Sequence, residues 1–263
     1  MESILTPCSS SHLYGKVINP GKLSSSSSSA GLSRRELERL REMMVFRHRG
    51  GQLFSTGYSG ERAKTPGNRR TGRTTMEAGP KAAGKSSFDL IDLDRFFALL
   101  DLVPGQRFVD LACGTGRYSL ETAKRLGDSG QVHAVDLWTQ GIAALDRTIR
   151  EQSVTNIATH VADISRCVPL AGGSFDACLL AAVLHDLAEE GQEGALREAA
   201  RLLKPRGILT VVEFKKTADG PGPPAGIRIA EPELERKVTG RGFSLRRCED
   251  LGPFMYLCQF RKA

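Results

Sequence analysis

Residues 108–120 constrain the fold of this chain most strongly, because an apolar strand there runs directly into a glycine turn and a helix. The strand reaches Asp110, the turn contains Gly114 and Gly116, and a helical pattern begins at Tyr118. Glycine lacks a Cβ atom, so such a turn can adopt positive φ and let a ligand approach the main chain. The unpaired N–H groups at the helix start favour an anionic group there.

A second strand ends in an acidic residue twenty positions after this turn. Residues 132–136 read Val-His-Ala-Val-Asp, and the Asp136 carboxylate can accept hydrogen bonds from two ribose hydroxyls. The two features together predict a nucleoside-bearing ligand in a Rossmann-like fold. A dinucleotide-binding fingerprint requires Gly or Ala at its third position, where this chain has Ser119.

The rest of the chain after residue 108 alternates between strand and helix patterns, which predicts a parallel doubly wound sheet. Further strands are expected over residues 156–164, 175–184 and 208–214, with a helix over residues 196–203. Two more strands, 242–248 and 254–260, are separated by only five residues. This gap is too short for a crossover helix, so these strands are expected to be antiparallel.

The residues Asp-x-Ala-Cys-Gly-x-Gly at 110–116 resemble the first motif of class I S-adenosylmethionine-dependent methyltransferases, although Ala112 stands where that family usually has Gly. Ser-Phe-Asp at 174–176 and Leu-Lys-Pro-x-Gly at 203–207 resemble the family as well. Val-Leu-His-Asp-Leu at 183–187 and the segment 250–257 are similar to its type-11, or ubiquinone-biosynthesis-like, subgroup.

The resemblance covers about residues 86–263. It implies an α/β fold with a Rossmann-like, doubly wound, seven-stranded sheet that is mostly parallel and ends in an antiparallel hairpin. It also implies S-adenosylmethionine as cofactor and a small molecule as methyl acceptor. The alternatives are an NAD(P)-dependent oxidoreductase and a catalytically inactive protein that binds S-adenosylmethionine.

Within the resemblance, the glycine turn is expected to receive the methionine part of the cofactor and Asp136 the ribose. Asp163 is expected to reach the adenine amino group, with the backbone N–H of Ile164 at the ring. The expected cofactor-binding residues are Phe88, Asp110, Ala112, Gly114, Gly116, Tyr118, Asp136, Leu137, Asp163, Ile164 and Ala181.

Methyl transfer from a sulfonium is mainly a task of proximity, and a base is needed only if the acceptor must lose a proton. Ligands of open α/β sheets bind beyond the carboxyl ends of the strands, where His185 and Asp186 are expected. We expect His185 to be a base or an acceptor-orienting group, with Asp186 orienting it and Glu213 as a second candidate. Alternatively, His185 bonds only to backbone, and Glu213 pairs with Lys215 or Lys216.

Two segments, 86–92 and 220–228, are expected to border the acceptor. Ser87 or Asp89 is expected to cap the helix that follows the first of them. Arg228 in the second is expected to pair with an anionic acceptor or to form a surface salt bridge.

Residues 1–85 differ in composition from residues 86–263, which are expected to form the methyltransferase domain. The first part is rich in Ser, Gly and Arg and is expected to be largely disordered. It carries 15 basic and 6 acidic residues, whereas the rest carries 22 basic and 24 acidic residues. The expected domain therefore lacks the positive charge that drives phosphate contacts, which disfavours nucleic acid as a substrate.

Targeting and metal-binding signals are weak. The prediction is a cytoplasmic protein; the alternative is an organellar one, because the Ser-rich beginning has the composition of a transit peptide. No run reaches 18 apolar residues, so no membrane-spanning helix is expected. The six cysteines form neither Cys-x-x-Cys nor zinc spacing, which indicates no metal site and a reducing compartment, with Cys178 and Cys258 in the core.

A P-loop pattern, Gly-x4-Gly-Lys-Ser, occurs at residues 79–86. A phosphate-binding P-loop follows a hydrophobic strand, and the polar residues 68–75 before this pattern cannot form one. We therefore do not expect an ATP site here. The sequence gives no indication of the oligomeric state.

Overall fold

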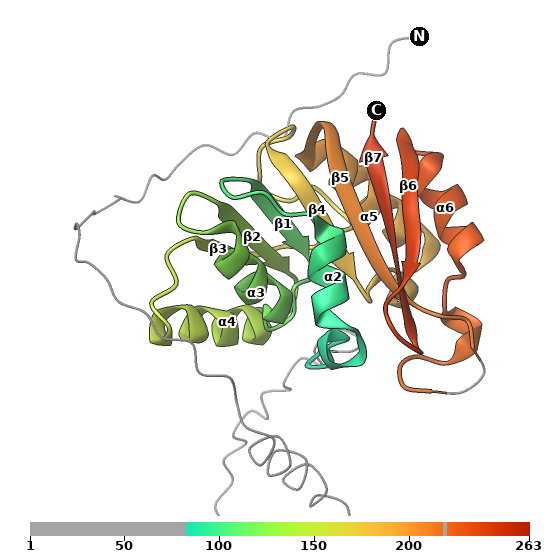
Figure 1. Ribbon diagram of the computed structural model, residues 1–263, viewed down its shortest axis with the longest axis horizontal. Coiled ribbons are helices and arrows are strands. Elements are labelled where there is room, and N and C mark those ends of the chain that lie inside the picture. Colours follow the sequence, from blue (N-terminus) through green and yellow to red (C-terminus); the bar gives the residue numbers. More distant parts are fainter. Residues whose placement is uncertain (1–82, 218–219) are drawn as a thin grey trace, which may run out of the picture. The chain divides into compact units, whose positions relative to one another are not determined.

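The computed structural model describes residues 83–217 and 220–263. The expectations of disorder and of a transit peptide concern residues that lie almost entirely outside this part of the chain. The described residues form one mixed sheet with the order β3-β2-β1-β4-β5-β7-β6 (Figure 1). Its strands are β1 (Arg107–Leu111), β2 (Gln131–Asp136), β3 (Ile157–Val161), β4 (Phe175–Ala181), β5 (Leu203–Phe214), β6 (Phe243–Asp250) and β7 (Met255–Lys262).

Helices cover both faces of the sheet. One face packs against α2 (Leu93–Leu100), α3 (Arg117–Leu126) and α4 (Thr139–Glu151), which lie in front of the sheet in Figure 1. The other face packs against α5 (Glu189–Leu202) and α6 (Glu231–Thr239). Short 3₁₀ turns, η1 (Phe88–Leu90), η2 (Leu184–Asp186) and η3 (Ala225–Ile227), complete the set of described helical elements.

Successive side chains of the central strands point to opposite faces of the sheet, so each strand packs against both helical layers. In β1, Phe108 points to the α2–α3 side, whereas Val109 and Leu111 point to the α5–α6 side, and all three are fully buried. A strand buried on both faces must be apolar at consecutive positions, which is the pattern of β1 and β4.

The C-terminal hairpin gives the sheet its mixed character. β7 inserts between β5 and β6 and is antiparallel to both, while the pairs among β1 to β5 are parallel. The expected fold class, a mostly parallel seven-stranded sheet with an antiparallel end, is confirmed. The usual dinucleotide-binding order, 3-2-1-4-5-6, lacks such an inserted antiparallel strand.

Some element boundaries differ from the expectations. β5 begins at Leu203 and carries an irregularity over residues 204–207, so the Pro and Gly expected to separate helix from strand lie inside the strand. α5 begins at Glu189 rather than residue 196. The cap of α2 is Asp92, whose Oδ1 accepts from Arg95 N at 3.0 Å. Neither Ser87 nor Asp89 caps it, because residues 88–90 form a separate 3₁₀ turn first.

A disulfide joins Cys248 in β6 to Cys258 in β7. The two residues are direct partners across the hairpin, with Cα atoms 4.1 Å apart, and neither was expected to be bonded. The disulfide disagrees with the expected reducing compartment, because that expectation depended on cysteine spacing along the chain and not on cross-strand register. Cys178 is fully buried in β4, as expected.

Gly194 allows α5 to approach the loop that follows β3. A Cβ atom built on Gly194 would overlap the carbonyl oxygen and carbon of Ser165, which are backbone atoms and cannot rotate away. The contact therefore fixes how closely α5 packs beside residues 163–165.

We expect Gly194→Ala to destabilise the protein by about 1–3 kcal/mol through this overlap, even though Ala stabilises an average helix position. Urea unfolding of the full chain measures the effect. Gly191→Ala is the matched control, because the nearest atom to its Cβ is a side-chain atom of Leu187 at 3.3 Å. Equal stability of the two variants would contradict the expectation.

Candidate functional site

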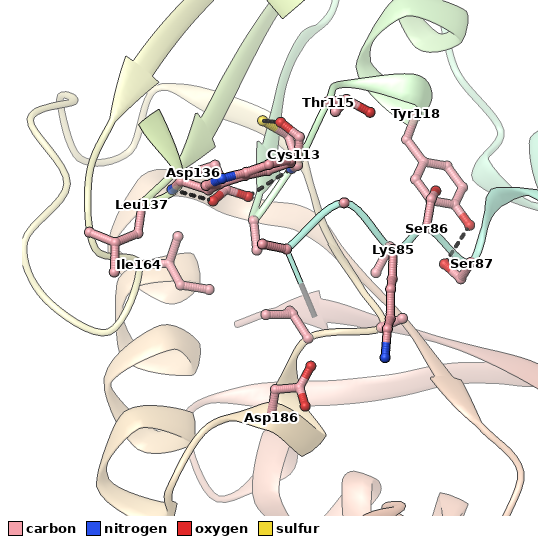
Figure 2. Close-up of a pocket in the computed structure, with 18 of the residues that line it drawn as sticks. Lys85, Ser86, Ser87, Cys113, Thr115, Tyr118, Asp136, Leu137, Ile164 and Asp186 are labelled. Atoms are coloured by element: carbon pink, nitrogen blue, oxygen red, sulfur yellow. Dashed lines mark hydrogen bonds between the residues drawn. The ribbon is translucent and has the colours of Figure 1, made fainter. Parts of the chain in front are cut away.

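A cavity of about 250 Å³ opens at the carboxyl ends of β1, β2 and β4 (Figure 2). This is the edge of the sheet at which open α/β folds bind their ligands. The residues that line it are Ala83, Gly84, Lys85, Ser86, Ser87, Ala112, Cys113, Gly114, Thr115, Arg117, Tyr118, Asp136, Leu137, Trp138, Asp163, Ile164, Ala181, Ala182, Val183, Asp186 and Leu187.

The turn after β1 has positive φ at three positions: Ala112 (65°), Gly114 (58°) and Gly116 (74°). The two glycines serve different purposes. A Cβ on Gly114 would meet no atom within 4 Å, so this backbone faces the open cavity. A Cβ on Gly116 would overlap the Leu145 side chain of α4, so Gly116 is needed for packing and does not line the cavity.

The Asp136 carboxylate lies between the turn after β1 and the loop after β2. Its Oδ2 accepts from Gly114 N and its Oδ1 accepts from Trp138 N, both at 2.7 Å (Figure 2). Each carboxylate oxygen has a second acceptor site, and Asp136 lines the cavity. The carboxylate is therefore fixed in place and still able to accept hydrogen bonds from a ligand.

Asp110 lies behind the turn and not in the cavity lining. It is 1% exposed, and its Oδ2 accepts from Ser119 Oγ at 2.6 Å. Burial, together with the nearby charge of Asp136, raises the pKa of Asp110 to about 7 against the effect of the Ser119 hydrogen bond. Ser119 stands where a dinucleotide-binding fingerprint has its third glycine. Its hydroxyl donates a hydrogen bond to Asp110 and so links α3 to β1.

Asp163 and Ile164 form another side of the cavity, with Leu137 and Trp138 nearby in the lining. Asp163 Oδ1 accepts from both the N–H and the hydroxyl of Ser165, at 2.9 and 2.6 Å. The Leu137 side chain is 53% exposed although it is apolar. A flat apolar ring would cover this exposed surface and place its polar edge near Asp163.

His185, Glu213 and Asp186 form a chain of titratable groups that reaches the cavity at Asp186. His185 Nδ1 lies 2.6 Å from Glu213 Oε2, and His185 Nε2 lies 3.5 Å from Asp186 Oδ2. Glu213 is fully buried, and its Oε1 also accepts from Leu184 N at 3.0 Å. Asp186 lines the cavity, whereas His185 and Glu213 lie behind it.

Two opposing effects set the protonation of His185. Burial lowers its pKa, but the hydrogen bond and negative charge of Glu213, together with the charge of Asp186, outweigh burial. The pKa of His185 is therefore raised above its ordinary value of 6.5. Glu213 does not pair with Lys215 or Lys216, which contact Asp250 and Glu233 instead.

The segment 83–90 closes another side of the cavity. Ser87 Oγ and Tyr118 Oη are 3.0 Å apart, and the Asp89 carboxylate forms a two-point ion pair with Arg117, one contact of which is 2.6 Å. Phe88 does not line the cavity; its ring packs edge-on against Tyr118 with centroids 5.0 Å apart. Phe88 thus fastens the segment to α3.

Lys85 and Trp138 are cavity residues that the sequence did not predict. Lys85 belongs to the P-loop pattern, of which residues 79–82 lie outside the described part of the chain. Figure 2 shows its side chain extending toward the side of the cavity where Asp186 lies and away from Cys113. Trp138 could have been predicted as a cavity residue, because it lies two residues after Asp136 and the end of the same strand positions both.

The expectations and the cavity lining agree for nine residues and differ for five. The nine that line it are Ala112, Gly114, Tyr118, Asp136, Leu137, Asp163, Ile164, Ala181 and Asp186. The five that lie outside the lining are Phe88, Asp110, Gly116, His185 and Glu213. Arg228 was expected to meet an acceptor or the surface, but it is buried and donates to backbone carbonyls.

Residues 108–207 match the family model described as a methyltransferase domain. Over this segment the chain is similar to class I S-adenosylmethionine-dependent methyltransferases. This confirms the resemblance inferred from the sequence, including its type-11-like character.

Curated relatives of this methyltransferase domain include the ubiquinone/menaquinone biosynthesis C-methyltransferase UbiE of Shewanella sp. strain W3-18-1, which is 32% identical over 114 residues. That match covers 43% of this chain and 44% of the relative. The UbiE of Shewanella frigidimarina is 32% identical over 112 residues, with 42% and 43% covered. The chain thus spans under half the length of the curated relatives it matches.

Solved structures extend the similarity beyond the matched segment. A S-adenosylmethionine-dependent methyltransferase from Aquifex aeolicus superposes with a TM-score of 0.63 at 22% identity and covers 70% of this chain and 96% of that one. The Burkholderia thailandensis 1,6-didemethyltoxoflavin N1-methyltransferase, solved with S-adenosylhomocysteine, superposes at 0.52 and 21% identity, with 65% and 76% covered. At these identities the likeness establishes the fold.

Within residues 83–217 and 220–263, no helix is long and apolar enough to cross a membrane. The same residues contain no cluster of three or more His, Cys, Asp or Glu side chains that could hold a metal ion.

We expect Tyr118→Phe to loosen the segment over the cavity, because it removes the hydrogen bond to Ser87 and keeps the ring. Loss of one buried hydrogen bond of about 1 kcal/mol predicts about fivefold faster hydrogen exchange at the Leu90 amide. That amide bonds to Ser87 O at 2.9 Å and so reports on the segment.

Tyr256→Phe is the matched control, since its hydroxyl bonds to Ile229 O at 2.8 Å in another part of the molecule. Exchange at Leu90 that is unchanged in Tyr118→Phe would contradict a fastening role for this hydroxyl.

Proposed function

We propose that this protein transfers a methyl group from S-adenosylmethionine to a small-molecule acceptor. The single observation that carries the proposal is the Asp136 carboxylate, held by Gly114 N and Trp138 N at 2.7 Å and bordering the cavity. A fixed carboxylate beside an exposed backbone turn matches a ribose next to a charged amino-acid group. The family match and the similar fold support the same cofactor.

The cavity offers a place for each part of this cofactor. The ribose hydroxyls would donate to Asp136, and the adenine would lie between Leu137 and Ile164 with its amino group toward Asp163. The methionine part would lie along Ala112 and Gly114. The methyl sulfonium is the electrophile that the cofactor supplies when bound, and the chain's own residues orient the acceptor and exclude water.

The acceptor would meet the cavity on the side of Lys85, Ala182 and Asp186. His185 does not line the cavity, so the proton of the acceptor would reach its Nε2 by way of the Asp186 carboxylate, which lines the cavity and lies 3.5 Å from Nε2. Glu213 would hold the ring through the 2.6 Å contact at Nδ1. This reverses part of the sequence interpretation, in which Asp186 oriented His185.

The acceptor proposed is small and not a nucleic acid, since residues 86–263 carry 24 acidic against 22 basic side chains. The Shewanella relatives are named ubiquinone/menaquinone biosynthesis C-methyltransferases, so aromatic compounds related to these quinones are the first probes. The compartment is proposed to be the cytoplasm, or an organelle if the Ser-rich beginning acts as a transit peptide.

We expect Asp136→Ala to weaken binding of S-adenosylhomocysteine to the full chain by about 100-fold or more, because two charge-assisted hydrogen bonds are lost. Calorimetric titration measures it. Asp136→Asn keeps one acceptor oxygen and should fall between the wild type and the Ala variant. Asp128→Ala, at an exposed position, is the control. Unchanged affinity in Asp136→Ala would remove the main support for the proposal.

We expect His185→Ala to lower kcat about 100- to 10,000-fold if the acceptor must lose a proton, while cofactor affinity stays within about twofold. Transfer of a labelled methyl group to an acceptor found in the aromatic screen provides the assay. His133→Gln is the control, since His133 does not line the cavity. Full activity of the His185→Ala variant would contradict the role of His185 as a base.

The pH dependence has a definite sign. His185 must be neutral to accept a proton, so kcat/KM should fall as the pH drops through its raised pKa. The midpoint of this loss should therefore lie above 6.5, the ordinary value. A midpoint well below 6.5, or no acid limb, would contradict the role of His185 as the base.

A further inference from the structure

Arg228 is a buried cation that donates to four backbone carbonyls and to Thr217 Oγ1. It is 4% exposed. Its Nε donates to Pro223 O at 2.8 Å, its Nη1 to Lys215 O at 3.0 Å and Thr217 O at 3.3 Å, and its Nη2 to Pro221 O at 3.1 Å. No carboxylate of the described residues forms a salt bridge with it. Burying an arginine is costly unless its charge is compensated nearby.

The four carbonyls belong to the connection between β5 and α6, which is rich in Gly and Pro. One planar guanidinium thus binds carbonyls from residues 215–217 and 220–224, which form no helix or strand. The same segment packs on aromatic rings, because a Cβ on Gly222 would overlap Phe214 and a Cβ on Gly220 would overlap Phe254. Arg228 therefore sets the course of this connection along the end of β5.

Phe214 links Arg228 to His185. The guanidinium carbon lies 5.6 Å from the centre of the Phe214 ring, and the His185 ring packs edge-on against the same ring with centroids 5.5 Å apart. Phe214 directly follows Glu213, which binds His185 Nδ1. Phe214 therefore contacts both the Arg228 guanidinium and the His185 ring, and the Arg228 charge lowers the pKa of His185.

We propose that Arg228 is a positioning residue for His185: it holds the β5–α6 connection against Phe214 and places a positive charge near the imidazole, so that His185 stays free to accept a proton. The inference rests on the proposed function. The Arg228 charge opposes the effect of the Glu213 and Asp186 carboxylates, which favour the imidazolium. A planar group with bonds to four carbonyls also prevents the connection from swinging away from Phe214.

Charged and titratable groups reach His185 from every element that packs against it. Glu213 comes from the end of β5, Asp186 from η2, and Arg228 from the segment before α6. Tyr256 in β7 is buried, and its hydroxyl donates to Ile229 O. Glu213 and Asp186 favour the imidazolium, and Arg228 is the cation among them that opposes it.

The test is the titration of His185 in the full chain, followed by NMR of ring-labelled histidine and assigned with His185→Gln. In Arg228→Gln, the midpoint should rise by about one pH unit, because a positive charge that opposes protonation of the ring is removed. Arg246→Gln, at an exposed position in β6, is the control and should leave the midpoint unchanged. A folded Arg228→Gln variant with the wild-type midpoint would overturn the proposal.

Arg228→Lys separates charge from shape. Lysine keeps the positive charge but cannot reproduce the planar fork. We expect the His185 midpoint to stay close to that of the wild type, while hydrogen exchange at residues 220–228 becomes at least tenfold faster and KM rises more than kcat falls. If Arg228→Gln does not fold, the proposal is tested with Arg228→Lys instead. Wild-type exchange at residues 220–228 would then overturn the proposal.

Calorimetry with S-adenosylmethionine on the wild type distinguishes this inference from the proposed function. Absence of binding would defeat the proposed function, yet the His185 titration in the Arg228 variants would still report whether Arg228 acts on that ring.

Discussion

The hydrogen bonds from Gly114 N and Trp138 N to the Asp136 carboxylate are the constraint on which the cavity depends. They join the turn after β1 to the loop after β2, two connections that the sheet places side by side. Without the carboxylate, both amides would lie unpaired at the cavity wall. The same group has lone pairs left for a ligand, so the interaction that shapes the cavity is also suited to recognise a ribose.

Buried titratable groups stand behind the cavity in two places. Asp110, with a pKa raised to about 7 mainly by burial, is held by Ser119 behind the glycine turn. Glu213 and His185 form a second buried pair behind Asp186, close to the antiparallel end of the sheet. The insertion of β7 beside β5 matters here, because it buries Glu213 from the side opposite β4 and leaves the carboxylate to bond with His185 and Leu184 N.

The sequence predicted the fold well because strand identity and direction are local properties. Apolar runs buried on both faces, as in β4, and the short gap between β6 and β7 determine the sheet without knowledge of distant contacts. The cavity wall was predicted where a residue lies at or just after the end of a strand, as with Asp136 and Asp163. Prediction failed where tertiary contacts decide: Gly116 packs on Leu145, Phe88 packs on Tyr118, and Arg228 turns inward. Lys85 was missed because it lies in a segment before the first strand, and only a tertiary contact brings that segment to the cavity.

The most direct test of the central claim is calorimetric titration of the full chain with S-adenosylmethionine and, separately, with NAD. Binding of S-adenosylmethionine in the micromolar range with no heat from NAD is the predicted result. A folded protein that binds NAD and not S-adenosylmethionine would contradict the proposed function and favour an oxidoreductase.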